Sequence, residues 1–286
     1  MPKILITGAG GQLGQEIQGI SKNFPNFQYF WATHQDLDIT NLESISTYIE
    51  KNGIEAIVNC AAYTAVDKAE QEVEKAYLIN ELGVKNLATV AKEKELKLIH
   101  ISTDYVFDGQ SNVPYNPEHK TNPLGIYGKT KLAGENALLE IAPKNSAIIR
   151  VSWLYGACAN NFVKTMLRLA KERTEIKVVY EQIGSPTYAK DLAEAILTIL
   201  PKLENEKPSI YHYANTGVAS WFDLAKTALK LVNYQGKVMP ILTKDYPTPA
   251  TRPAYSVLDT SKIREDFNLT IPYWQDSLYN CIERLK

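Results

Sequence analysis

A tyrosine and a lysine lie four residues apart in the segment IYGKTKLAGE, residues 126–135. In a helix this spacing places Tyr127 and Lys131 on one face, one turn apart. A free tyrosine has a pKa near ~10, so it needs assistance to exchange a proton at neutral pH. The ammonium of Lys131 can give that assistance, because a positive charge favours the phenolate. The spacing therefore indicates a tuned proton donor; the alternative is a surface tyrosine beside a solvated lysine.

Hydroxyl groups occur at a second place that suits catalysis. Ser102, Thr103 and Asp104 stand at the carboxyl end of the apolar run KLIHIS, residues 97–102, which is typical of a buried strand. In an open α/β sheet, ligands bind just beyond the carboxyl ends of such strands. A hydroxyl there can hold, by a hydrogen bond, the carbonyl oxygen that Tyr127 protonates. Serine and threonine at a strand end can also simply form a turn, but the tyrosine and lysine favour the catalytic interpretation.

A glycine-rich turn lies near the beginning of the chain. The segment ITGAGGQLG places Gly8, Gly11 and Gly14 between an apolar run, residues 3–7, and a stretch with helical spacing. Glycine permits a tight turn and lets backbone N–H groups approach a pyrophosphate, while the helix N-terminus adds a positive dipole end. This context predicts dinucleotide binding rather than only a tight connection. Lys131 can then also bond the ribose hydroxyls of the cofactor.

The sequence leaves the choice between NADPH and NADH open. The acid that would bind the ribose 2′-hydroxyl of NAD at the end of the second strand is not evident in WATHQD, residues 31–36. A 2′-phosphate is therefore permitted there, although no arginine is present to bind it. Asp38 can meet the adenine or cap the following helix.

Short apolar runs alternate with helical stretches through the first half of the chain. This alternation predicts a parallel sheet buried on both faces, in a Rossmann-like, doubly wound α/β fold. The expected strands are residues 3–7, 27–32, 56–62, 97–102 and 147–156, and the expected helices are residues 42–52, about 70–95 and a stretch from Tyr127 onward.

The pattern loosens after residue 156. We expect an NAD(P)-binding domain, residues 1–156, and a smaller C-terminal α/β substrate-binding lobe, residues 157–286, with the chain able to cross between them more than once. Residues 108–125 form a predicted long loop, and loops of that length are often functional. The later expected elements are helix 162–173, strand 176–180, a helix from near Tyr188, strand 211–215, helix 220–232, a proline-rich stretch at 240–253 and helix 273–285.

The composition argues against several classes of partner. The chain has 286 residues, 45% of them hydrophobic, which is enough for a large core. It carries 31 lysines and arginines against 32 aspartates and glutamates, so its net charge of −1 attracts neither nucleic acid nor an anionic membrane. The apolar residues 4–6 are too few for a signal peptide, and no run approaches the ~18 residues of a membrane span. We therefore expect a cytoplasmic protein without nucleic-acid or membrane partners.

The cysteines and histidines indicate neither disulfides nor a metal site. Cys60, Cys158 and Cys281 are odd in number, far apart and outside any C-x-x-C spacing. The 4 histidines have no partners at a usable metal-ligand spacing.

With these motifs, the chain resembles the extended short-chain dehydrogenases/reductases and, within them, the dTDP-4-dehydrorhamnose reductase family. The resemblance spans nearly the whole chain, and the pairing of AAYTAVDKAE with STDYVFDG is far more specific than the superfamily pattern. The matching stretches are GGQLGQE, DIT, VNCAAYTAVDKAE, STDYVFDG, YGKTKLAGE, RVSWLYG, NNFVKTMLRLAKE, GSPTYAKDLA and TRPAYSVLDTSKI.

The resemblance implies a reaction, in which NAD(P)H reduces the C4 ketone of dTDP-4-dehydro-β-L-rhamnose. Tyr127 would protonate the developing alkoxide, Lys131 would tune Tyr127 and hold the nicotinamide ribose, and Thr103 would orient the carbonyl. The implied cofactor contacts are Gly8, Gly11, Gln12, Leu13 and Gly14 at the pyrophosphate, Asp38 and Ile39 on the adenine side, and Ala61, Ala62 and Thr64 beyond the third strand. The implied sugar-nucleotide contacts are Asp104, Tyr105, Trp153 and Arg252; Trp153 can instead be core, Tyr105 can pack under the loop, and Arg252 can bond backbone carbonyls.

One departure from the family concerns a metal. Some members are described as dimers joined by a metal that glutamates bind, one of them just after an S-P-T-like segment. Here Glu16 remains, but that second place is Lys190, whose charge would oppose a cation. We therefore expect no metal, and either a monomer or a homodimer.

Two other functions compete with this one. Another nucleotide-sugar reductase or epimerase of the superfamily would share Thr103, Tyr127 and Lys131 and would differ in the C-terminal lobe. The regulatory subunit of methionine adenosyltransferase resembles the same family and acts by binding a partner. The intact Tyr127, Lys131 and Thr103 weigh against that second alternative, because a binding module has no need of a tuned proton donor.

Overall fold

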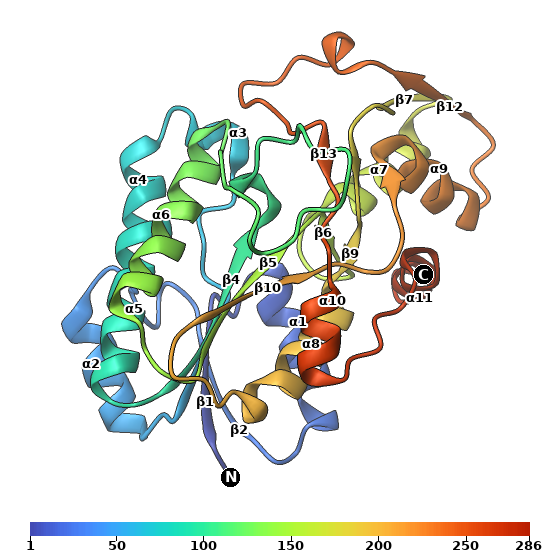
Figure 1. Ribbon diagram of the computed structural model, residues 1–286. Coiled ribbons are helices and arrows are strands. Elements are labelled where there is room, and N and C mark those ends of the chain that lie inside the picture. The colour runs from blue at the N-terminus through green and yellow to red at the C-terminus, as the bar shows by residue number, and fades with distance from the viewer.

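A six-stranded parallel sheet forms the centre of the protein, in a computed structural model that describes residues 1–286 (Figure 1). Its strand order is β10-β5-β4-β3-β1-β2, which confirms the doubly wound α/β fold that the sequence predicts. The strands are β1 (Lys3–Thr7), β2 (Gln28–Ala32), β3 (Ala56–Asn59), β4 (Lys97–Thr103), β5 (Ser146–Val151) and β10 (Ser209–Tyr213).

Helices cover both faces of this sheet, because successive side chains of a strand point to opposite faces. On β1, Ile4 and Ile6 pack into one core and Leu5 packs into the other. The first core is completed by α1 (Gln12–Ile20), α8 (Ala189–Ile199) and α10 (Ser261–Phe267). The second is completed by α2 (Leu42–Asn52), α5 (Gly83–Glu93) and α6 (Ile126–Ile141).

The helix expected at about residues 70–95 is interrupted. It consists of α4 (Val73–Tyr77), a π turn at Leu78–Leu82 and α5, preceded by the short α3 (Val66–Ala69). Asn80 explains the interruption, because its buried side chain bonds both backbone groups of Tyr63 and the hydroxyl of Thr130 on α6. These contacts are distant in sequence, so the local pattern could not reveal them.

Part of the second half of the chain returns to the first sheet. Strand β10 extends this sheet beside β5, and α8 packs against α1. The remaining elements form the C-terminal lobe, at the upper right of Figure 1. They are β6 (Leu154–Tyr155) with β9 (Thr187–Tyr188), β7 (Glu175–Val179) with β12 (Lys237–Ile241), β8 (Ile183–Gly184) with β11 (Ala219–Ser220) and β13 (Tyr255–Ser256), and helices α7 (Phe162–Glu172), α9 (Trp221–Leu231) and α11 (Trp274–Glu283).

The long loop 108–125 contains neither a helix nor a named strand, as expected, but long-range contacts hold it. Tyr115 exchanges backbone hydrogen bonds with the segment after β13, at 2.9 Å to Val257 and 2.8 Å from Asp259. Arg150 on β5 donates to the carbonyl of Pro117 at 3.3 Å. These contacts hold the loop in place beside the carboxyl end of β4.

None of the helices combines the length and apolar character that crossing a membrane would require.

Candidate active site

The strand ends that the sequence singled out meet along one edge of the sheet. The register pairs Thr7 of β1 with Asn59 of β3, Asn59 with His100 of β4, and Thr103 with Val151 of β5. Since β2 lies on one side of β1 and β3 on the other, the chain reverses its direction of winding at β1. Such a switch point is where doubly wound sheets bind ligands.

The glycine turn forms a close backbone cradle at this point. Gly8 has a φ of +63°, and a Cβ on it would lie 2.6 Å from the backbone nitrogen of Ala61. A Cβ on Gly14 would lie 2.6 Å from the Cα of Ala9. Gly11 caps α1 without a side chain, which leaves the N–H groups of the first turn available. The residues present therefore fit a dinucleotide pyrophosphate.

On the adenine side, two carboxylates are already engaged in local turns. Asp36 accepts from the backbone and the hydroxyl of Thr33, at 2.9 and 2.6 Å. Asp38 is exposed and accepts from the backbone and hydroxyl of Thr40, at 2.9 and 2.7 Å. The cap of α2 is Asn41, so the helix-capping role considered for Asp38 belongs to that residue.

Ile39 is buried next to Gly83, where a Cβ would lie 2.7 Å from the Ile39 side chain. Asn86 on α5 holds the same turn by donating to the carbonyls of Ile39 and Thr40, at 3.1 and 2.9 Å. Sequence reasoning missed Asn86. The signal for it was an amide on the otherwise apolar face of a helix.

Tyr127 lies in the first turn of α6, and its hydroxyl faces that of Thr103, which lowers the pKa of the phenol. Burial raises the pKa of Tyr127 to about 12, against the lowering effect of Thr103 and with a further increase from Asp104. Gly128 allows α6 to pack closely against the segment after β4. A Cβ at this position would lie 2.2 Å from the carbonyl oxygen of Tyr105, so a larger residue would push the helix away. The rings of Tyr105 and Tyr127 meet edge to face at 5.4 Å.

Lys131 is fully buried behind Tyr127. Its ammonium donates to the carbonyl of Ile101 at 2.7 Å and lies 3.4 Å from Nε2 of His100. Burial lowers the pKa of Lys131 to about 8, against the raising effects of Glu135 and Cys60. In this arrangement burial dominates the pKa of the phenol and the ammonium turns toward the sheet, so the tuning of Tyr127 by Lys131 stays a prediction.

A polar chain that sequence reasoning missed lies beside Lys131 at the end of the sheet. Ala61 N–H and the Thr7 hydroxyl both donate to Oδ1 of Asn59, at 3.1 and 2.6 Å, which fixes the orientation of that amide. Its Nδ2 then donates to Nδ1 of His100 at 3.0 Å. The pKa of His100 lies well below its ordinary value because of burial and the nearby Lys131, so the ring is neutral and carries its proton on the nitrogen facing Lys131.

Of the two hydroxyls at the end of β4, only Thr103 faces the phenol. Ser102 donates instead to Glu135, which is paired with Arg150 at 2.7 Å. Thr103 donates to Oδ1 of Asp104 at 3.0 Å.

Asp104 is buried, with only 3% of its surface exposed. Burial raises the pKa of Asp104 to about 6, although the nearby hydroxyls of Ser256 and Thr103 oppose that increase. Its second oxygen, Oδ2, has no hydrogen-bond partner.

Trp153 interrupts the long strand that the sequence predicts at residues 147–156. Its φ of +47° bends the chain between β5 and β6, and its ring stacks on Trp221 with centroids 3.7 Å apart. A Cβ on Gly184 would lie 2.6 Å from the ring of Trp153. The side chain is only partly buried and packs against the core of the C-terminal lobe.

Arg252 does not project freely into the site. Its guanidinium pairs with Asp67 at 2.8 Å, and its only backbone contact is a 3.5 Å approach to the carbonyl of Ala250. Arg252 also interacts electrostatically with Tyr105. The pair therefore connects the proline-rich segment with α3 beside Tyr105.

Of the candidate cofactor contacts beyond β3, Ala61 lies against the glycine turn and Ala62 is partly buried. Thr64 is exposed.

Glu16 forms an ion pair within the chain, with an arginine near the C-terminus. It is fully buried, pairs with Arg284 at 2.7 Å and accepts from the backbone of Ala157 at 3.1 Å. Lys190, the residue expected to place a positive charge there, instead pairs with Glu194 at 3.7 Å.

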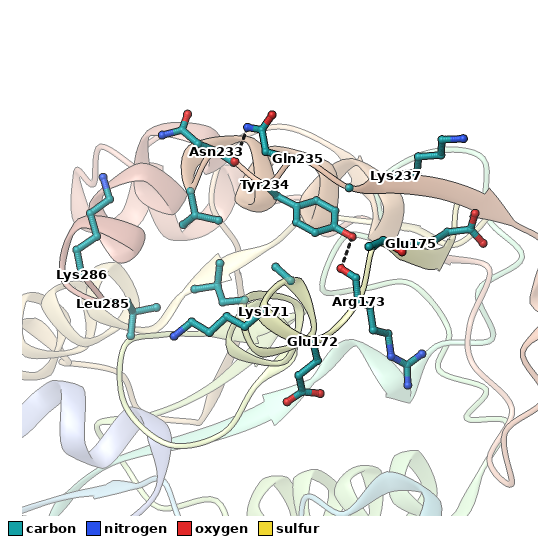
Figure 2. Close-up of a pocket in the computed structure, with 15 residues that line it drawn as sticks. Lys171, Glu172, Arg173, Glu175, Asn233, Tyr234, Gln235, Lys237, Leu285 and Lys286 are labelled. Atoms are coloured by element: carbon teal, nitrogen blue, oxygen red, sulfur yellow. Dashed lines mark hydrogen bonds between the residues drawn. The ribbon is translucent and has the colours of Figure 1, made fainter.

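A large cavity of about 1130 Å³ lies elsewhere, between the ends of α7 and α9 and the C-terminus (Figure 2). Lysines and arginines alternate there with glutamates, and Figure 2 shows the Tyr234 hydroxyl bonded to the carbonyl of Arg173, at 3.0 Å. This cavity contains no residue predicted to act in catalysis.

Comparisons with known proteins agree with this geometry. The family model described as the RmlD substrate binding domain matches residues 2–286. The dTDP-4-dehydrorhamnose reductase of Aggregatibacter actinomycetemcomitans is 42% identical, over 98% of each chain. The crystal structure of a dTDP-4-dehydrorhamnose reductase from Clostridium acetobutylicum is similar with a TM-score of 0.93 and 42% identity, over 99% of each chain. That of the Bacillus anthracis dTDP-4-dehydrorhamnose reductase, in complex with NADP, has a TM-score of 0.94 and 39% identity, over 99% of each chain.

Proposed function

The chain belongs to the RmlD substrate binding domain family, and from this premise we propose that it reduces the C4 ketone of dTDP-4-dehydro-β-L-rhamnose to dTDP-β-L-rhamnose with NADPH. The observation that carries the proposal is the meeting of Tyr127, Thr103 and Lys131 beside the glycine turn, at the switch point of the sheet.

The cofactor, when bound, supplies the hydride for the ketone carbon. The N–H groups at the glycine turn bind its pyrophosphate, and the dipole of α1 favours the negative charge. Lys131 binds the nicotinamide ribose, and its pKa of about 8 keeps most of the amine protonated at neutral pH. Thr103 holds the ketone oxygen beside Tyr127, whose hydroxyl donates the proton that neutralises the alkoxide.

The sugar nucleotide occupies the space between this edge and the C-terminal lobe. Tyr105 and Asp104 border the ketone, and Trp153 offers an aromatic face from the lobe. Arg252 binds the diphosphate by exchanging Asp67 for phosphate oxygens, which a guanidinium fork suits. We accordingly assign residues 1–156 mainly to cofactor binding and residues 157–286 mainly to the substrate, with β10 and α8 returning to the first domain.

The decisive experiment follows NADPH absorbance, and separately NADH absorbance, with dTDP-4-dehydrorhamnose supplied, and identifies the product by NMR. Oxidation of NADPH with formation of dTDP-rhamnose is the expected result. A different C4 stereochemistry would assign the chain to another nucleotide-sugar reductase, and turnover of no keto sugar nucleotide would refute the enzymatic proposal.

We also propose that the protein acts as a monomer or homodimer, without nucleic-acid or membrane partners and in the cytoplasm. Its net charge of −1 supports the absence of polyanionic partners, and the internal pair of Glu16 and Arg284 supports an assembly that needs no metal. Sedimentation with and without EDTA tests this, because a chelator-sensitive dimer would contradict it.

A further inference from the structure

The hydroxyl of Thr103 lies between the phenol of Tyr127 and a buried carboxyl group. The Thr103 hydroxyl faces the Tyr127 hydroxyl, whose pKa it lowers, and it donates to Oδ1 of Asp104 at 3.0 Å. The backbone N–H of Tyr105 donates to the same threonine oxygen at 3.2 Å and holds it in place. The phenol, the hydroxyl and the carboxyl therefore lie next to one another, where the end of β4 meets the first turn of α6.

The far oxygen of this carboxyl group is unusual. Asp104 is 3% exposed, and its Oδ2 has no hydrogen-bond partner. A buried carboxylate oxygen without a partner is costly, so a carboxylate with a purely structural role would be fully bonded. Glu135, on the same helix as Tyr127, is bonded in that way by Ser102 and Arg150. The incomplete bonding of Asp104 fits a group that alternates between a charged and a protonated form.

We propose, on the basis of the reductase function above, that Asp104 restores the proton that Tyr127 gives up in each turnover, through the hydroxyl of Thr103. After the phenol proton has passed to the alkoxide, the Thr103 hydroxyl gives its proton to the phenolate. Thr103 takes the proton of the Asp104 carboxyl at the same time, and Asp104 becomes a carboxylate. The carboxylate regains a proton from solvent between turnovers, so each cycle consumes one hydride and one proton, as reduction of a ketone requires.

The electrostatic surroundings permit this direction of transfer. Burial raises the pKa of Asp104 to about 6 and that of Tyr127 to about 12, so the phenolate is by far the stronger base. The groups that face the carboxyl are Ser256 from β13 and the phenols of Tyr105 and Tyr127. Both phenols are neutral in the range where Asp104 titrates, because burial raises their pKa values.

The variant Asp104→Asn removes the proton supply, and comparing its first turnover with its later ones separates that loss from any loss of substrate contact. Asparagine keeps the size and an oxygen acceptor for Thr103 but has no proton to deliver. Enzyme loaded with NADPH is mixed with the keto sugar nucleotide in a stopped-flow instrument, and NADPH absorbance is followed. We expect a burst in which one equivalent of NADPH is oxidised, followed by turnovers that are at least about tenfold slower than this burst.

A first turnover slowed as much as the later ones would overturn the proposal, because Asp104 would then act in binding or folding. Wild-type enzyme serves as the control for the reaction itself. Failure of the wild type to oxidise NADPH would refute the proposed function, whereas an active wild type with no burst in Asp104→Asn would refute only the proton route.

The variant Ser256→Ala gives an independent test that leaves Asp104 in place. The Ser256 hydroxyl lowers the pKa of Asp104, so its removal raises that pKa. Because the route needs the protonated carboxyl, kcat should fall as pH rises through the pKa of Asp104. This fall in kcat should occur at higher pH in Ser256→Ala and be absent in Asp104→Asn. A fall in kcat at the same pH in the wild type and both variants would contradict the proposal.

Discussion

Ser102 and Thr103 are neighbours at the end of β4, yet they belong to different kinds of buried polar cluster. We call Ser102, Glu135 and Arg150 the Glu135 cluster, and Thr103, Asp104 and Tyr127 the Asp104 cluster. In the Glu135 cluster, Arg150 makes three hydrogen bonds to the carboxylate, at 3.0, 3.2 and 2.7 Å, and another to the carbonyl of Pro117. In the Asp104 cluster, one carboxyl oxygen has no partner.

The completeness of hydrogen bonding distinguishes buried polar groups that stabilise the fold from those that take part in catalysis or binding. Neighbouring residues of a strand point in opposite directions, so Ser102 and Thr103 enter different environments although they are both hydroxyls. A completely bonded charged pair fixes the loop and α6, whereas an incompletely bonded acid next to a phenol retains capacity to exchange protons or to bind a substrate.

The largest effect is expected from Tyr127→Phe in the Asp104 cluster. The phenyl ring cannot donate a proton, so turnover should fall ~10²–10⁴-fold. Affinity for NADPH should remain, since the change removes only a hydroxyl. Steady-state rates and fluorescence titration with NADPH measure the two quantities, with the exposed Tyr279→Phe as the matched control. Turnover close to that of the control would remove Tyr127 from the role of donor.

The Glu135 cluster should respond in stability instead. Glu135→Gln leaves Arg150 buried at 3% exposure without a counter-charge, and breaking such a pair costs about 3–5 kcal/mol of the free energy of unfolding. The rate per folded molecule should change far less than in Tyr127→Phe, although loss of the Glu135 charge lowers the pKa of Lys131 further. Urea unfolding, together with activity normalised to folded protein, checks this. A variant as stable as the wild type but inactive would abolish the distinction between the clusters.

Lys131 belongs to neither cluster and should affect binding and rate together. Lys131→Ala removes the ribose contact and the buried positive charge, so we expect at least about a tenfold loss in kcat/KM and a weaker NADPH affinity. Lys129→Ala, an exposed lysine on the same helix, is the matched control. An effect confined to KM for the sugar nucleotide would instead place Lys131 on the substrate side.

The pH dependence of cofactor binding gives a smaller, graded signal. The pKa of Lys131 is lowered to about 8 by burial, so the ammonium is present below that pH and is lost above it. NADPH affinity should therefore decrease as pH rises through about 8. Calorimetric titrations across this range measure it, and affinity that is constant up to the ordinary lysine range would show that the ammonium stays charged.

The smallest effect should come from the half-exposed pair of Asp67 and Arg252, which sharpens the contrast with the buried pair. Asp67 is 41% exposed, and exposed ion pairs stabilise proteins by only about 0–1 kcal/mol. Asp67→Asn should therefore change the urea midpoint little, while Glu135→Gln changes it greatly. Equal losses in both variants would show that burial does not govern these pairs.

The sequence by itself determined the elements whose signals are local. Helix α2 begins and ends where it was expected, at residues 42 and 52, because Asn41 caps one end and Gly53, with a φ of +63°, ends the other. The glycine turn, the β1–β5 order along the chain, and the helical spacing of Tyr127 and Lys131 are likewise local patterns.

Only the tertiary structure decided how those side chains are used. The orientation of Lys131 toward Ile101, the interruption of the helix at Asn80, and the bend at Trp153 all depend on residues far away in the sequence. The same holds for the burial of Asp104, because Ser256 arrives from β13 more than a hundred residues later. Spacing along the chain fixes which groups share a helix face or a strand end, whereas solvent exclusion and hydrogen-bond partners, which set pKa values, exist only once distant segments pack together.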